Sequence, residues 1–165
     1  MEKYNHNSTF KWKPRKPLKR TALKLSSNSD VAQLKKEIQR LLREIVIIRD
    51  GGCIARNTAS HTCNGYRNDG ELILQADHLI TRSNSATYGD SRLVVCVCKG
   101  LHGWKSVGSN MRKNQYDALI KTLLPKNRVE LWEKCEQESW QAHRMGFYDW
   151  MLVIVALKSE LKQLQ

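Results

Sequence analysis

The sequence lacks any segment of the kind that crosses a membrane or directs export. Its most apolar stretch, residues 147–157, contains Asp149 and is far shorter than the roughly 20 apolar residues that span a bilayer. No apolar run of signal-peptide type precedes residue 25, and neither a lipid-attachment signal nor a basic helix with a large apolar face is evident. We therefore expect a cytoplasmic protein without a membrane partner, in which residues 147–157 belong to the core.

Acidic residues are scarce relative to basic ones. The 165 residues include 16 Asp and Glu against 28 Lys and Arg, which gives a formal net charge of +12 and a sequence pI near 9.7. This excess of positive charge favours a polyanionic partner, and nucleic acid is the first candidate. The length fits one compact domain with a basic extension, because a single core is stable at this size.

Residues 11–24 contain no acidic residue at all. Pro14 and Pro17 oppose a regular helix there, and repulsion between like charges opposes collapse. We expect residues 1–28 to form a flexible basic arm and residues 29–165 to form the folded domain, although a solubilising tail or an expression remnant would have a similar composition. Trp12 could stack on a base. The arm cations expected to contact DNA phosphates are Lys11, Lys13, Arg15, Lys16, Lys19 and Arg20.

The cysteines lack the even number that a set of disulfides requires. Five are present, namely Cys53, Cys63, Cys96, Cys98 and Cys135. In a reducing compartment such residues serve as metal ligands or as small buried apolar groups. Cys135 falls in a predicted helix without a neighbouring ligand, so we expect it to be a buried hydrophobic residue.

The hydrophobic pattern predicts an α+β fold. Apolar residues recur at spacings of three and four from Leu34 to Ile48, which indicates an amphipathic helix over residues 30–50, capped by Ser29 and ended by two glycines. Short apolar runs at 71–76 and 93–98 predict the strands of a β-hairpin. Further helices are expected near residues 110–124, 126–140 and 147–164.

Three residues around the predicted hairpin carry the candidate chemistry. Asp77 and His78 follow the first strand, and His102 begins the helical segment after the second strand. Antiparallel pairing would bring Asp77 and His102 to one divalent ion, which could be Mg, Mn, Ni or Zn, with positions left open for phosphate and water. His78 would then face a water as general base. We expect the Asp77 carboxylate and the His102 imidazole to lie within roughly 3 to 5 Å of each other if both bind one ion.

Three cations near this group, Arg82, Arg92 and Lys105, could position the scissile phosphate. Simpler interpretations also exist. Asp77 and His78 could form a turn that ends the strand, and the three cations could be ordinary solvated side chains. His6, His61 and His143 have no comparable context and are expected to be ordinary surface or core residues.

The segments QADHLITRSNSATYGD and LVVCVCKGLHGWKS resemble the motif of HNH, or ββα-metal, nucleases. The basic KPLKRT segment, the long helix ending in IRD, and the ADH, LITR and SAT segments are similar to the NinG/Rap recombination nucleases of lambdoid phages. The resemblance implies a small ββα-metal core with flanking helices, cleavage of branched DNA such as Holliday junctions or D-loops, and a location in the host cytosol. It places Asp77 and His102 as metal ligands and His78 as general base. The middle Asn of the motif has no clear equivalent, since Asn84 lies early in the loop.

Many HNH proteins also carry a structural zinc bound by two C-x-x-C pairs. Here Leu101 stands where the second cysteine of one pair would be, so one ligand position is left to fill. The resemblance implies a zinc site built from Cys53, Cys63, Cys96 and Cys98, with His61 as the alternative to Cys96 for that position. Cys96 and Cys98 are two residues apart on a strand and are expected to share a face. Alternatively, these cysteines are core residues and free thiols.

The sequence thus predicts a metal-dependent DNA endonuclease. A non-catalytic DNA-binding module with a degenerate HNH fold and an RNA-directed protein remain alternatives. Paired incision of a four-way junction often needs two active sites, which a homodimer would supply. The sequence leaves open whether the active unit is a homodimer.

Removal of residues 1–25 should weaken DNA binding at all sequences. Each phosphate contact that is lost should lower the slope of log affinity against log salt by about 0.9, because fewer counterions are released. Fluorescence anisotropy across a salt series measures this slope. An unchanged slope would argue against a binding role for the arm.

Overall fold

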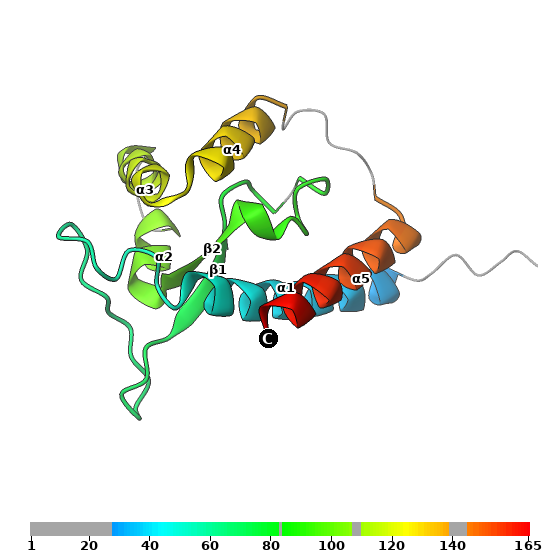
Figure 1. The fold of residues 1–165 in the computed structure, drawn as a ribbon, viewed down its shortest axis with the longest axis horizontal. Helices are drawn as coiled ribbons and strands as arrows, with labels where there is room; N and C mark the ends of the chain where they lie inside the picture. The colour runs from blue at the N-terminus through cyan, green and yellow to red at the C-terminus, as the bar shows by residue number, and fades with distance from the viewer. Residues whose placement is uncertain (1–27, 83, 107–109, 139–144) are drawn as a thin grey trace, which may run out of the picture.

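The computed structural model describes residues 28–165 except 83, 107–109 and 139–144, so the arm predicted at the N-terminus lies outside the described residues. The described chain is an α+β fold of five α-helices and one two-stranded antiparallel sheet (Figure 1). Its elements are α1 (Asn28–Asp50), β1 (Leu74–His78), the short 3₁₀ helix η1 (Ser91–Leu93), β2 (Val94–Cys98), α2 (Lys99–Ser106), α3 (Asn110–Leu123), α4 (Lys126–Glu138) and α5 (Phe147–Leu164).

The predicted α+β class is confirmed, and the four helices whose ranges were predicted, α1, α3, α4 and α5, match them within a few residues. Helix α1 begins at Asn28, so Ser29 lies inside the helix and does not cap it. Strand β1 begins three residues later than predicted, because the residues just before it pair with the preceding loop. Leu72 forms an isolated bridge with Tyr66, and the Ile73 N–H donates to the Gly65 carbonyl at 3.0 Å.

The register of the sheet determines which backbone groups face outward. The Leu79 N–H donates to the Leu93 carbonyl and the Lys99 N–H to the Ile73 carbonyl, each at 2.9 Å. Hydrogen-bonded and non-hydrogen-bonded pairs alternate in an antiparallel ladder. The pairs Ala76 with Cys96 and His78 with Val94 therefore direct their backbone groups away from the partner strand.

Three side chains and one backbone N–H bond the outer edge of β2 in place of another strand. The Asp50 carboxylate accepts the Cys96 N–H at 2.9 Å, and the Ile54 N–H donates to the Cys96 carbonyl at 2.8 Å. Arg49 and Arg128 both donate to the Val94 carbonyl, at 2.8 and 2.9 Å. These bonds satisfy polar groups of a strand whose residues are all buried.

Two hydrophobic cores lie on the two faces of the sheet, and α1 and α5 lie side by side below it in Figure 1. Val94 and Cys96 pack with the α1 and α5 side chains, whereas Val95, Val97 and Cys98 pack with those of α2, α3 and α4. The expectation that Cys96 and Cys98 share a face was therefore wrong, because the chain turns into α2 directly after Cys98 and the alternation ends there. None of the described helices combines the length and apolarity that a bilayer crossing requires.

Asp50→Ala should destabilise the fold strongly, because it leaves the Cys96 N–H without its acceptor and removes the buried carboxylate that pairs with the guanidinium groups of Arg49 and Arg128. Loss of one partner from a buried ionic network lowers the free energy of unfolding by about 3 kcal/mol or more. Glu130→Ala is the control, since its ion pair with Lys126 is exposed and should contribute less than about 1 kcal/mol. Denaturant titration of both variants gives the comparison. Equal stabilities would contradict the role of Asp50.

Candidate functional site

Asp77 and His102 meet where β1 faces the start of α2. Asp77 is 5% exposed, and its Oδ1 lies 3.7 Å from His102 Nε2. This separation falls within the window expected for two ligands of one ion. Strand β1 supplies the carboxylate and α2 supplies the imidazole, so the direct turn from β2 into α2 brings the two together.

Two further side chains contact the same carboxylate. Lys105 Nζ lies 3.1 Å from Asp77 Oδ2 and also donates to the His78 carbonyl at 2.7 Å. The Tyr116 hydroxyl, from α3, donates a short hydrogen bond to Asp77 Oδ2. Burial and the nearby Asp77 charge raise the pKa of Tyr116, so this phenol stays protonated and keeps donating. The sequence offered no signal for Tyr116, because it is distant in the chain and its contact is tertiary.

His78 is held by the loop that joins the strands. Its Nε2 lies 3.2 Å from the Tyr88 carbonyl, whereas its buried Nδ1 has no hydrogen-bond partner among the described residues. Burial, followed by the charge of Arg82, lowers the pKa of His78. The neutral ring therefore donates from Nε2 and carries its lone pair on Nδ1. Buried Asn84 supports this loop by accepting the Ala86 N–H at 3.1 Å.

An open cleft of about 600 Å³ contains all three predicted site residues. Its polar and charged lining comprises Asp77, His78, Thr81, Arg82, His102, Lys105, Lys113 and Glu136. Two of the three predicted phosphate-binding cations, Arg82 and Lys105, therefore lie at the site. Arg92 does not line this cleft, because its exposed guanidinium bonds Asp90 at 2.7 Å beside α4.

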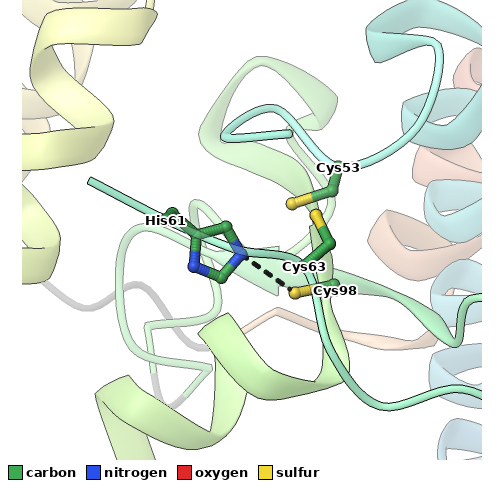
Figure 2. A group of neighbouring side chains, drawn as sticks. All are labelled: Cys53, His61, Cys63 and Cys98. Atoms are coloured by element: carbon green, nitrogen blue, oxygen red, sulfur yellow. Dashed lines mark hydrogen bonds between the residues drawn. The ribbon is translucent and has the colours of Figure 1, made fainter. Parts of the chain in front are cut away.

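A second group of candidate ligands joins three segments of the chain. The ligand atoms of Cys53, His61, Cys63 and Cys98 all lie within 4.8 Å of one another, and Figure 2 shows them converging. His61 Nε2 lies 3.2 Å from Cys98 Sγ. These four residues could hold a metal ion, and three of them are cysteines that the sequence named for a structural zinc.

Two sequence-based assignments around this cluster need correction. Cys96 is not a member, because its side chain lies on the α1 and α5 face of the sheet. We expected His61 to be an ordinary residue, although we also named it as the alternative to Cys96. It is the fourth member of the cluster. Its closeness to Cys63 in a loop rich in Gly, Asn and Thr was the available signal. Cys135 is partly buried against the core, in keeping with its predicted hydrophobic role.

The thiols of the cluster differ in acidity. Burial raises the pKa of Cys63 to about 12, and a hydrogen bond with Cys53 acts in the same direction. Burial also acts to raise the pKa of Cys98, but backbone N–H groups of Leu101 and Asn64 and the neighbouring thiols bond to its sulfur, and the pKa falls below its usual value. Cys98 is thus the thiol best prepared to act as an anionic ligand.

Comparisons with protein-family models, with curated proteins and with solved structures found no match.

Proposed function

We propose that this chain is a metal-dependent endonuclease that hydrolyses phosphodiesters in DNA. The observation that supports the proposal best is the convergence of Asp77, His78 and His102 in one cleft, with the two candidate ligand atoms 3.7 Å apart. The order strand, strand, helix around these residues agrees with the ββα-metal arrangement that the sequence motif implies.

The donor set at Asp77 and His102 fits a divalent ion. A carboxylate oxygen and an imidazole nitrogen that each bind an ion at about 2.1 Å lie between about 3.0 and 4.2 Å apart, depending on the angle between them. The Lys105 ammonium already rests against Asp77, which indicates that this position stabilises positive charge. A bound divalent ion would supply charge stabilisation for the phosphorane-like transition state and the departing 3′ oxygen.

His78 would act as the general base. With Nε2–H donated to the Tyr88 carbonyl, the lone pair lies on Nδ1, which is buried and would take a proton from a water molecule that enters beside it. The water oxygen then forms a bond to phosphorus, and the bond from phosphorus to the 3′ oxygen breaks. The 3′ oxygen leaves as an alkoxide and takes a proton from solvent, which yields a 5′-phosphate and a 3′-hydroxyl.

The substrate we propose is DNA, with branched recombination intermediates as the class that the motif resemblance favours. Arg82 and Lys105 lie in the cleft and would pair with phosphate oxygens. Lys105 also bonds the His78 carbonyl, so it would link phosphate binding to the position of the base.

A structural zinc at Cys53, His61, Cys63 and Cys98 is the second part of the proposal. Three sulfurs and one imidazole nitrogen form a set typical of closed tetrahedral zinc sites. Such an ion would tie the residues after α1 and the loop before β1 to the junction of β2 with α2. This junction precedes His102 by four residues, so the zinc would steady the catalytic cleft without entering it.

One observation favours a different function. Lys105 and Tyr116 already satisfy the Asp77 carboxylate, as they would in a DNA-binding module that has lost its metal. The two hypotheses differ in metal binding at Asp77 and in catalysis, whereas both retain the basic surface.

His78→Ala should reduce metal-dependent nicking of branched DNA by a factor of about 100 or more, because the general base is lost. Its DNA affinity, measured without divalent ions, should match that of the wild type. Asp77→Asn should raise the metal concentration needed for half-maximal nicking, because one metal ligand is lost. A wild-type protein that binds DNA but cuts none with Mg, Mn, Ni or Zn would support the module instead.

Purified protein should retain one zinc per chain after dialysis against a weak chelator, because structural zinc sites bind with apparent free energies of about 10 kcal/mol or more. Cobalt substitution should give the absorption of a thiolate-bound tetrahedral ion. Cys98→Ser and His61→Ala should each lose this spectrum, whereas Cys96→Ala is the matched control and should keep it. Loss of the spectrum in Cys96→Ala alone would refute the assignment.

A further inference from the structure

A second cleft, of about 390 Å³, lies along β1 and is also lined by His78. It shares His78, Arg82 and His102 with the candidate catalytic cleft, so the two clefts meet at the proposed site. Its lining residues are Gln39 and Arg43 of α1, Arg67 of the loop before β1, residues 73–76, His78, Arg82 and His102. None of them is acidic.

The arginines of this cleft differ from those that hold the fold together. Arg49 and Arg128 donate to backbone carbonyls of η1 and β2 and pair with Asp50. Their positive charge is therefore already paired within the protein. Arg43 is exposed on α1. Arg67 pairs with Glu71, but both side chains are more than half exposed, so a phosphate can displace that carboxylate at little cost.

The edge of β1 adds neutral groups of the kind that contact a nucleic-acid strand. Leu74 and Ala76 belong to the non-hydrogen-bonded pairs of the ladder, so their backbone N–H groups point away from β2. No strand pairs with this edge among the described residues.

We propose that this cleft binds the phosphate backbone of the substrate strand on one side of the scissile bond, with Arg43 and Arg67 as contacts that the sequence did not indicate. The inference rests on the proposed function, because it takes the meeting point of the clefts as the place where the strand is cut. A strand that follows both clefts passes Arg67, Arg43 and Arg82 before it reaches Asp77. An acidic protein segment could also contact these arginines, but its backbone would then have to lie along the edge of β1 among their guanidinium groups.

The test measures DNA binding by the full-length protein without divalent ions. Arg43→Gln and Arg67→Gln should each lower the affinity for a labelled branched DNA about five- to tenfold, and each should reduce the slope of log affinity against log salt by about one. Arg43→Lys should keep the salt slope. Arg92→Gln removes another exposed guanidinium, one that lies outside both clefts, and it should bind like the wild type.

Wild-type affinity and salt slope in both glutamine variants would overturn the proposal. So would a loss of binding in Arg92→Gln of the same size, since the effect would then reflect net charge alone. A labelled poly-glutamate peptide tests whether an acidic protein segment occupies the cleft instead. If the two glutamine variants lost peptide binding and kept DNA binding, the cleft would be assigned to an acidic protein. Because these measurements need no cleavage, they can support the cleft even if the wild type proves unable to cut DNA, which would count against the proposed function alone.

Discussion

The buried strand β2 needs partners on both edges, and the sheet supplies a strand on only one of them. The other edge is satisfied by the Asp50 carboxylate, the Ile54 N–H and the guanidinium groups of Arg49 and Arg128. A two-stranded hairpin is marginal by itself, and unpaired backbone groups in a core are costly. The end of α1 therefore does more than pack: it supplies the polar groups that allow β2 to be enclosed between two hydrophobic cores.

This constraint also determines where the candidate chemistry lies. Once the position of β2 is set, the register places Asp77 and His78 opposite Val95 and Val94, and the turn into α2 brings His102 back to within 3.7 Å of Asp77. The cysteine and histidine cluster acts at the same junction, because Cys98 is the last residue of β2. Cys98 lies opposite Leu74, at the other end of the hairpin from Asp77 and His78, and helix α2 links the proposed structural metal to the proposed catalytic group.

The positive charge of the chain is divided between two tasks. Arg49 and Arg128 are occupied by backbone carbonyls and by Asp50, where charge-assisted hydrogen bonds stabilise the fold. The arginines that line the two clefts beside His78 can act on a polyanion. The net charge of +12 therefore says little by itself about where a nucleic acid would bind.

The sequence alone determined the fold class, the helix ranges within a few residues, and the hairpin, because hydrophobic periodicity and glycine or proline breaks are local signals. It also indicated Asp77, His78 and His102 as a group, since the order strand, strand, helix limits where these residues can lie. Tertiary structure decided that His61 and not Cys96 joins the cysteines, that Tyr116 and Lys105 share Asp77, and that Arg92 lies elsewhere. Those outcomes depend on which faces pack together over long chain separations. Local spacing cannot encode that information, because a turn that ends one strand residue sooner or later sends the next side chain to the opposite core.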